Sequence, residues 1–430
     1  MRIAIVGLWH LGCVYAGCLA AVGHSVVAID EDEGVVRSLL ACDLPIEEPG
    51  LTDLLAQGVG GGSLRFSSRL EDLRESELVW LTIDTPVRSD DSADVAPVFD
   101  TALRIAEVMD PKAVLAISSQ VPLGTSREVL KRIRADRSGD CLEMAYCPEN
   151  LRLGSAISSF READRFVVGA SGSHASRVVS EALSPTGVPL QLMSLESAEL
   201  SKHALNAFLA MSVAFANEIG RLAEMGGANA RDVAESLKSE SRVGPRSYVM
   251  PGGPIAGGTL ARDVRYLNSL GEKFGLSIPL ISSVLESNSI QQAWAVDSLA
   301  ELCSPSAGPV LVFGLAYKQG TSTLRRSFGV HVANQLVAKG YQARTYDSLA
   351  EPSASLAESG SVRIGELDAA LDGAAAVIVC AADSSIDQLL ALIETSEAPP
   401  VVIDAIGIIA NWSTSERIVV RTPGRGVEPQ

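Results

Sequence analysis

The stretch Arg2-Ile-Ala-Ile-Val-Gly7-Leu-Trp9-His-Leu-Gly12 decides the fold of this chain. Its first half is a short apolar run that predicts a buried strand ending at Gly7, and the residues from Leu11 to Val22 predict a helix. A second predicted strand, from Ser25 to Asp30, follows a Gly-His turn. This strand-helix-strand order is typical of a doubly wound parallel sheet, in which ligands bind at the carboxyl ends of the strands.

The loop from Gly7 to Gly12 has the pattern of a dinucleotide-binding loop with one departure. Three glycines usually permit the tight turn, the approach of the pyrophosphate and close helix packing, and here Trp9 replaces the middle one. Asp30 ends the second strand, where a carboxylate would accept from ribose hydroxyls and repel a 2′-phosphate, so we expect NAD rather than NADP. The alternative is a turn that binds nothing, and the indole could shift the loop or weaken cofactor binding.

Composition limits the class of protein. The chain has 430 residues, of which 47% are hydrophobic, and this length predicts two or three domains. The formal net charge of −17 repels phosphate backbones and anionic lipid, so we expect no nucleic-acid or membrane partner. Seven cysteines without a CxxC pair favour the reducing cytoplasm, and we expect no metal site. The uncharged run from Leu11 to Ile29 is long enough for a membrane span, but it divides into a helix, a turn and a strand.

Strand-like runs alternate with helix patterns on both sides of a helical middle. They lie at Leu78 to Ile83, Ala113 to Ser118, Arg165 to Val168, Val310 to Gly314, Gln342 to Asp347, Ala375 to Cys380 and Val401 to Ile406. In the middle, Leu195 to Met225 has a broad apolar face that predicts a long central helix, and a second helical stretch follows from Gly258 to about Leu299. We therefore expect an α/β protein with two Rossmann-like doubly wound domains, at residues 1–192 and 307–424, joined by a helical middle domain at 193–300.

A set of short motifs runs along the chain in a fixed order. They are Leu44-Pro-Ile-Glu-Glu48-Pro-Gly50-Leu51, Thr85-Pro86, Val121-Pro-Leu-Gly124-Thr125, Cys147-Pro148-Glu149-Asn-Leu, Glu199-Leu-Ser-Lys202-His-Ala-Leu-Asn206, Ala256-Gly-Gly-Thr259-Leu-Ala-Arg262-Asp263, and Phe313-Gly-Leu-Ala-Tyr-Lys318-Gln-Gly-Thr321 with Arg325 and Ser327. In this order the chain resembles the UDP-glucose and GDP-mannose (nucleotide-sugar) dehydrogenase family from about Arg2 to Ile406. The resemblance implies NAD-dependent oxidation of the primary alcohol of a nucleotide sugar, a carboxy-terminal domain that binds the nucleotide, and a homodimer formed by the helical middle.

The resemblance also implies roles for individual residues. Lys202 and Asn206 are four residues apart on the central helix, so ammonium and amide share one helix face and could stabilise an alkoxide. Glu149 would hold a water as general base, and Asp263 would orient that water or Lys202. The expected cofactor contacts are Gly7, Trp9, His10, Leu11, Gly12, Asp30, Thr85, Pro86 and Gln120. The expected substrate contacts are Asn150, Leu151, Arg152, Arg246, Gly257, Gly258, Arg262, Lys318 and Arg325. Each residue also has a structural alternative. Lys202 could extend its side chain to solvent, Glu149 and Asp263 could cap a loop or helix, and the predicted phosphate-binding arginines could be solvated surface residues.

The family's cysteine nucleophile has no counterpart here. Aligning Arg262-Asp263 with the family's Lys-Asp puts Thr259 at the nucleophile position, and moving the gap by one residue puts Leu260 there. A hydroxyl is far less acidic than a thiol and the loop has no histidine, so we do not expect Thr259 to trap an aldehyde covalently. Cys147 is the only cysteine in a motif near the expected site, and free cysteines are more often buried hydrophobes than reactive groups.

Three functions remain open. The favoured one is NAD-dependent oxidation of a nucleotide sugar or similar nucleoside alcohol without the covalent thiohemiacetal step. The second is an isomerase or lyase in which tightly bound NAD oxidises the substrate transiently. The third is a non-catalytic nucleotide-sugar-binding protein, which the presence of Lys202, Asn206, Glu149 and Asp263 disfavours. Net accumulation of NADH separates the first from the second.

Overall fold

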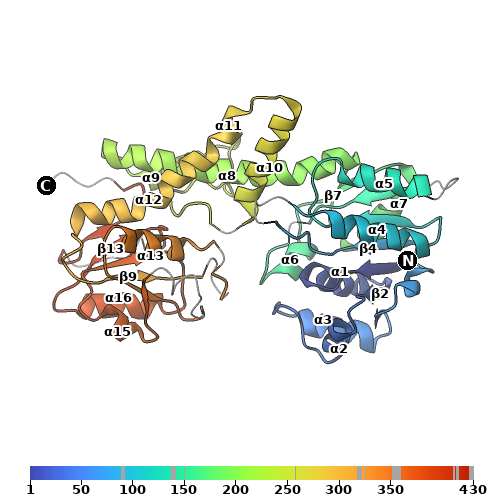
Figure 1. The fold of residues 1–430 in the computed structure, drawn as a ribbon, viewed down its shortest axis with the longest axis horizontal. Coiled ribbons are helices and arrows are strands. Elements are labelled where there is room, and N and C mark those ends of the chain that lie inside the picture. The colour runs from blue at the N-terminus through green and yellow to red at the C-terminus, as the bar shows by residue number, and fades with distance from the viewer. Residues whose placement is uncertain are drawn as a thin grey trace. The chain divides into compact units, whose positions relative to one another are not determined.

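The computed structural model describes residues 1–88, 93–136, 142–149, 151–256, 258–316, 322–324, 326–350, 360–409, 412 and 416–425. The chain divides into two compact units, Met1–His203 and Ala204–Gln430. Each unit has a sheet of its own (Figure 1). Each also has its own hydrophobic cores.

The amino-terminal unit is built on an eight-stranded sheet of order β3-β2-β1-β4-β5-β6-β7-β8. Its strands are β1 (Arg2–Val6), β2 (Ser25–Ile29), β3 (Leu64–Ser67), β4 (Leu78–Leu81), β5 (Val114–Ile117), β6 (Met144–Tyr146), β7 (Phe166–Ala170) and β8 (Leu190–Met193). Neighbouring strands are parallel except β6 and β7, which pair antiparallel. The order of the strands reverses between β1 and β4, and doubly wound sheets bind dinucleotides at such a switch point.

Helices cover both faces of this sheet because successive residues of a strand point to opposite sides. The helices are α1 (His10–Ala21), α2 (Glu33–Leu40), α3 (Leu51–Gly60), α4 (Ala96–Val108), α5 (Thr125–Asp136), α6 (Ala156–Arg161) and α7 (Ser173–Leu183), with short 3₁₀ turns at Leu70–Leu73 and Ser184–Thr186. In β1, Ile3 and Ile5 pack with residues of α1, α3 and α7, whereas Ala4 and Val6 pack with residues of α4 and α5.

The uncharged run in the sequence belongs to this core. Every residue from Leu11 to Ala20 in α1 is buried, which explains why the helix has no polar face. The strand β2 follows it after a turn at Gly23, as predicted. Among the described residues, no helix is both long and apolar enough to cross a membrane.

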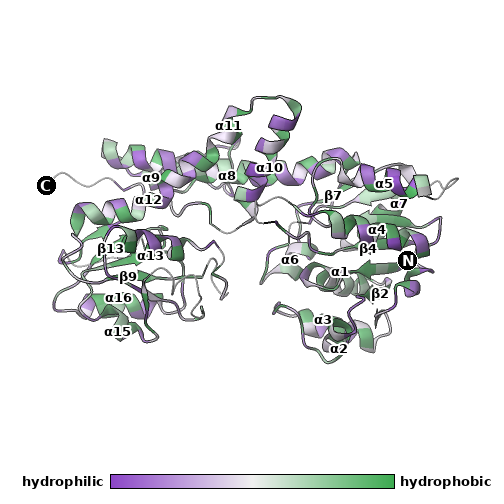
Figure 2. Ribbon diagram, viewed as in Figure 1, coloured by the Kyte–Doolittle hydropathy of each residue, from purple (hydrophilic) through white to green (hydrophobic). Residues whose placement is uncertain are grey.

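The carboxy-terminal unit contains a six-stranded parallel sheet of order β11-β10-β9-β12-β13-β14. Its elements are β9 (Val310–Phe313), α13 (Phe328–Ala338), β10 (Ala343–Tyr346), β11 (Val362–Arg363), α15 (Leu367–Leu371), β12 (Ala376–Val379), α16 (Ile386–Thr395), β13 (Val401–Asp404) and β14 (Val420–Arg421). Val310 and Val312 pack against one layer of helices, and Leu311 and Phe313 against the other. The hydrophobic colour of the central strands in Figure 2 reflects this burial on both faces.

The helical middle begins with α8 (Leu195–Gly226), which is 32 residues long. Gly169 of β7 lies beneath its first turns, where an added Cβ would be 2.7 Å from the Cβ of Ala198. After α8 come α9 (Ala230–Ser239), α10 (Thr259–Phe274), α11 (Pro279–Ser282) and α12 (Val284–Leu302). The helical stretch predicted from Gly258 to Leu299 is therefore three helices, because Gly275 ends α10 with φ 67° and Pro279 begins α11.

The predicted fold class is confirmed, with two Rossmann-like sheets and a long central helix. The division into three domains at residues 1–192, 193–300 and 307–424 stays a prediction. In the structure α8 begins in the amino-terminal unit and continues in the carboxy-terminal one, since the two compact units meet at His203 and Ala204.

Candidate functional site

The turn between β1 and α1 leaves no room for side chains at two glycines. Gly7 has φ 98°, and an added Cβ there would lie 2.4 Å from Cγ2 of Ile83. An added Cβ at Gly12 would lie 1.9 Å from the backbone oxygen of Gly7. Thr82 stabilises the turn, because its hydroxyl donates to the backbone oxygens of Val6 and Gly7. The turn thus has the close packing that a dinucleotide loop requires.

Trp9 occupies the position of the missing middle glycine without backbone strain. Its φ of −86° and ψ of −163° are extended values that any L residue adopts, and it precedes the first residue of α1. The residue is 45% exposed, so the indole does not fill the core of the unit. The first N–H groups of α1 have no acceptor within the helix and are suited to bind a phosphate.

Asp30 contacts the glycine-rich loop directly. Its carboxylate accepts from the backbone N–H of Leu8 at 2.9 Å and from that of Asp32 at 3.1 Å. A carboxylate has further lone pairs, so these contacts are compatible with the predicted bonds to ribose. Asp30 therefore also fixes the loop that precedes α1.

Thr85, Pro86 and Gln120 follow β4 and β5, at the same edge of the sheet as Gly7. The hydroxyl of Thr85 is buried and has no hydrogen-bond partner among the described residues. An unsatisfied buried hydroxyl is costly unless a ligand pairs with it. The narrow glycine turn, Asp30 and this hydroxyl fit a bound NAD.

His10 joins the loop to two other motifs through Glu48. His10 Nε2 lies 2.9 Å from Glu48 Oε2, and the carboxyl group of Glu48 is almost completely buried. The same carboxylate accepts from the backbone N–H groups of Gly154 and Ala156, each at 2.8 Å. Sequence reasoning assigned no role to Glu48, although it lies in the proline-rich motif.

Lys202 and Glu149 lie together in the amino-terminal unit, as the predicted site requires. Lys202 Nζ donates to the backbone oxygen of Glu149 and lies 3.8 Å from its Oε1. The Lys202 side chain is 9% exposed and that of Glu149 27%. Glu149 Oε2 also accepts from the N–H of Leu151 at 2.7 Å. A cation thus lies beside a carboxylate that solvent still reaches.

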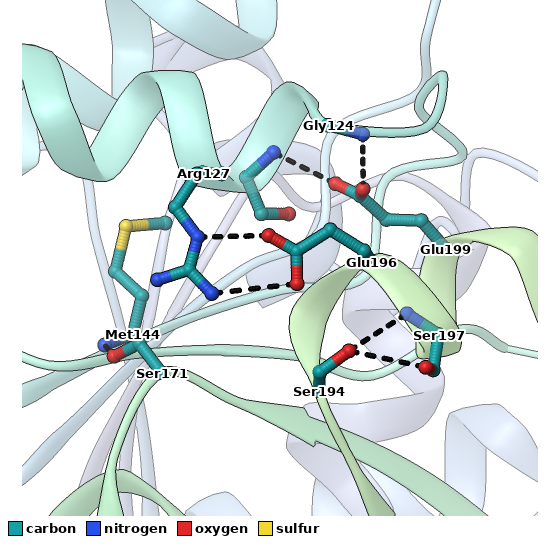
Figure 3. Close-up of polar contacts among 9 residues, drawn as sticks. Gly124, Arg127, Met144, Ser171, Ser194, Glu196, Ser197 and Glu199 are labelled. Carbon is teal, nitrogen blue, oxygen red and sulfur yellow. Dashed lines mark hydrogen bonds and ion pairs between the residues drawn. The ribbon is translucent and has the colours of Figure 1, made fainter.

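Glu199 lies three residues before Lys202 on α8. It is a buried carboxylate to which the sequence analysis assigned no role. It is completely buried and accepts from the backbone N–H groups of Gly124 and Ser126, at the start of α5 (Figure 3). Burial raises the pKa of Glu199, and these backbone hydrogen bonds oppose the rise. His203, one turn further along α8, pairs through Nε2 with the backbone oxygen of Val121. The first turns of α8 thereby fix the loop that follows Gln120.

Glu196 forms a different kind of contact on the same helix. Its carboxylate pairs with the guanidinium of Arg127 through two hydrogen bonds, of 2.8 and 3.3 Å (Figure 3). The hydrogen bond from Arg127 lowers the pKa of Glu196. Both side chains are well exposed, so this pair is a surface contact.

In the carboxy-terminal unit, Asn206 contacts Asp263. The amide of Asn206 donates to the carboxylate of Asp263, and both residues are buried, with exposures of 6% and 1%. Thr259 begins α10 and is exposed, and Arg262 and Asp263 follow in its first turns. The structure therefore places the predicted polar residues as two groups, Glu149 with Lys202 and Asn206 with Asp263.

Three buried amides hold the loop that leads to Thr259. The side-chain oxygen of Asn217 accepts from the N–H of Gly252 at 2.8 Å, and the amide of Gln291 donates to the backbone oxygen of Gly252 at 2.9 Å. Asn288 accepts from the N–H of Ile255 at 2.6 Å. Sequence reasoning missed these amides because they are spread over α8 and α12, far from the loop in the sequence.

Several predicted substrate residues have separate positions. Leu151 and Arg152 follow Glu149 in the amino-terminal unit, whereas Gly258, Arg262 and the exposed Arg246 belong to the carboxy-terminal unit. Asn150, Gly257, Lys318 and Arg325 lie outside the described residues. Their proposed contacts stay predictions.

Cys147 does not have the environment of a nucleophile. The residue is 4% exposed, and burial raises the pKa of its thiol far above the ordinary range. A thiolate is the reactive form, so a thiol in this state is unreactive. This agrees with the interpretation of Cys147 as a small buried hydrophobe.

Comparison with known proteins covers most of the chain. Residues 1–185, 196–290 and 311–411 match, respectively, the NAD binding, central and UDP binding domains of the UDP-glucose/GDP-mannose dehydrogenase family. A UDP-glucose 6-dehydrogenase of Bacillus subtilis is 30% identical over 94% of this chain and 88% of its own length. One from Rhizobium meliloti is 33% identical over 81% of each chain. The structure of a UDP-glucose dehydrogenase from Pyrobaculum islandicum is similar with a TM-score of 0.84 at 28% identity, covering 99% of this chain and 98% of that one.

Proposed function

Because this chain belongs to the UDP-glucose/GDP-mannose dehydrogenase family, we propose that it oxidises the primary alcohol of a UDP-sugar such as UDP-glucose without a covalent thiohemiacetal step. The family's NAD-binding domain is present, and the chain is an NAD-dependent oxidoreductase acting on CH–OH donors. The observation that carries the proposal is the contact of Lys202 with Glu149, which provides a cation and a base at one place.

The residues of this contact suit removal of a hydroxyl proton. The Glu149 carboxylate, directly or through a water, would accept that proton, and the Lys202 ammonium would stabilise the alkoxide that forms. Bound NAD supplies the hydride acceptor, and Gly7, Gly12 and Asp30 would hold it. Glu149 is kept in place by the N–H of Leu151, so the base needs little rearrangement before the reaction.

Asn206 and Asp263 would orient the substrate oxygen or its water. Asn206 lies four residues after Lys202 on α8, so the two side chains share one helix face. The contact with Asp263 uses one amide hydrogen of Asn206 and leaves the amide oxygen as an acceptor. Loss of the amide would therefore change substrate orientation more than cofactor binding.

In this proposal the second half of the reaction proceeds without a thiol, because the family's cysteine aligns with Thr259 or, with the gap moved by one residue, with Leu260. Thr259 is an exposed hydroxyl at the start of α10, and no histidine lies between residues 244 and 263 to activate it. Cys147 is buried with a raised pKa. We propose that the aldehyde is released, or is hydrated and oxidised again without an enzyme-bound intermediate.

Absorbance at 340 nm with UDP-glucose and NAD tests the proposal. Net formation of NADH supports it, and product formation at constant NAD would instead indicate the isomerase or lyase. Lys202→Ala should lower the rate of hydride transfer by at least about 100-fold while NAD affinity stays near that of the parent. Lys131→Ala, which changes an exposed lysine of α5, is the control. Equal turnover in Lys202→Ala and Lys131→Ala would show that the site is assigned wrongly.

Thr259→Cys tests the alignment at the nucleophile position. The test applies where the parent releases the aldehyde after one NADH: if that aldehyde forms beside residue 259, the variant should release a second NADH for each UDP-glucose and produce the acid. The measurement is the ratio of NADH to sugar product by absorbance and chromatography. An unchanged ratio and product would contradict the placement of Thr259 beside the reacting carbon.

We also propose a homodimer that forms through α8. Phe208, Phe215 and Leu222 are spaced seven residues apart on this helix and are 62%, 47% and 68% exposed. Such a row of exposed apolar side chains on one helix suits association with another helix. Phe208→Ser with Phe215→Ser should shift the mass measured by light scattering from dimer to monomer. The cytoplasm is the proposed location, in agreement with six free cysteines among the described residues.

A further inference from the structure

The glycine-rich loop and the segment that carries Glu149 are joined by hydrogen bonds within the amino-terminal unit. His10 lies in the loop between Gly7 and Gly12, and its Nε2 is 2.9 Å from Glu48. Glu48 in turn accepts from the backbone N–H groups of Gly154 and Ala156. At the other end of that segment, the N–H of Leu151 donates to Glu149.

Glu48 uses one carboxyl group for three contacts. Its oxygens accept from the N–H groups of Gly154 and Ala156, and the imidazole with its hydrogen on Nε2 donates to the same group from His10. The Glu48 carboxyl group is 1% exposed and the His10 side chain 15%, so water competes little for either. A hydrogen bond to a buried charged group is stronger than one between neutral groups.

We propose that His10 and Glu48 are positioning residues through which a dinucleotide bound at the loop orders residues 151–156 and hence Glu149. This inference rests on the proposed function, because it requires NAD to bind at Gly7 to Gly12. A ligand on the first turn of α1 limits the movement of His10. Because Glu48 is bonded both to His10 and to the N–H groups of Gly154 and Ala156, these two residues then also move less. By thermodynamic linkage, a substrate that orders residues 151–156 must then strengthen NAD binding.

Hydrogen exchange of the full chain, measured by mass spectrometry with and without NAD, tests the link. In the parent, NAD should slow exchange at residues 10–13 and, by about tenfold, at residues 154–156; a hydrogen bond to a charged group is of that order. His10→Phe keeps a flat ring but cannot donate, so NAD should slow exchange only at residues 10–13. His10→Gln places an amide donor near the position of Nε2 and should restore the effect at residues 154–156.

The control is His174→Phe, which changes a histidine bonded to the backbone oxygen of Lys112, away from both loops. It should behave as the parent. Slowed exchange at residues 154–156 in His10→Phe would overturn the inference, and so would protection of residues 10–13 alone in the parent. No protection anywhere would mean that NAD does not bind, which overturns the proposed function and this inference with it.

An equilibrium binding readout separates positioning from mere stabilisation of α6. NADH takes the place of NAD here because it cannot accept a hydride, so UDP-glucose is not consumed during the titration. The dissociation constant for UDP-glucose, measured by calorimetry, should fall when NADH is present in the parent and in His10→Gln, and in His10→Phe it should be about the same with and without NADH. If NADH strengthens UDP-glucose binding equally in all three proteins, His10 has no part in the coupling and the inference is overturned.

Discussion

Glu199→Ala should destabilise the amino-terminal unit more than any replacement of an exposed glutamate on the same helix. Glu199 is completely buried, and its removal leaves the N–H groups of Gly124 and Ser126 without their acceptor. Each buried N–H that loses its partner costs about 1–3 kcal/mol. The parent already bears the cost of burying a carboxylate, which reduces the net loss, so we expect about 3 kcal/mol in the free energy of unfolding.

The assay is thermal unfolding of the full chain by calorimetry. For a unit of about 200 residues, about 3 kcal/mol corresponds to a fall of roughly 6–12 °C in the midpoint. Exchange of the β5 amides identifies which transition belongs to the amino-terminal unit. Glu196→Ala is the matched control, because its partner Arg127 is exposed and such pairs contribute less than about 1 kcal/mol. A midpoint for Glu199→Ala within about 2 °C of the control would refute the reasoning.

The pH dependence of the unfolding midpoint gives a second test of the role of Glu199. Because burial raises the pKa of Glu199, the folded unit binds its proton more tightly than the unfolded chain does. Stability from this group is therefore present at low pH and is lost as pH rises through the folded pKa. Glu199→Gln does not titrate, so the midpoint of the parent relative to this variant should fall as pH rises above the ordinary range of a glutamate carboxyl. A constant difference would contradict the raised pKa.

Three further predictions concern the cofactor loop and the thiols. Gly12→Ala should weaken NAD binding by at least about 100-fold in a fluorescence titration, because its Cβ would lie 1.9 Å from the oxygen of Gly7; near-normal affinity would mean that the loop is more plastic than described. Trp9→Gly should lower the dissociation constant for NAD severalfold, since it restores the space for the pyrophosphate. An unchanged constant would show that the Trp9 side chain does not hinder NAD binding. Iodoacetamide should label the exposed Cys42 quickly and Cys147 only after unfolding, as read by peptide mapping; fast labelling of Cys147 with loss of activity would favour a thiol mechanism.

Elements with a strong local pattern could be predicted from the sequence, whereas those that depend on distant partners could not. The buried strand before Gly7 and the long helix from Leu195 lie within a residue or two of their predicted limits. The short strands β6 and β8 were not predicted, because three or four residues carry little periodicity and their pairing partners are far apart in the sequence.

The same distinction applies to the site. Lys202 and Glu149 could be matched to a motif, and the structure brings them together. Glu48 and Glu199 hold backbone N–H groups of other segments, and nothing in the local sequence reveals which N–H a carboxylate will meet. Motif residues that contact ligands are thus easier to predict than the buried carboxylates that support them.

The antiparallel pairing of β6 with β7 has a consequence for where the chain leaves the first sheet. In an ordinary βα unit the helix runs opposite to its strand, back to the edge where the strands begin. Here β8 follows the direction of β7, so α8 travels toward the edge where β1, β4 and β5 end. The inversion of β7 and β8 thereby directs α8 to the edge where β6 ends, and this is why Lys202, in the third turn of that helix, can donate to the backbone oxygen of Glu149.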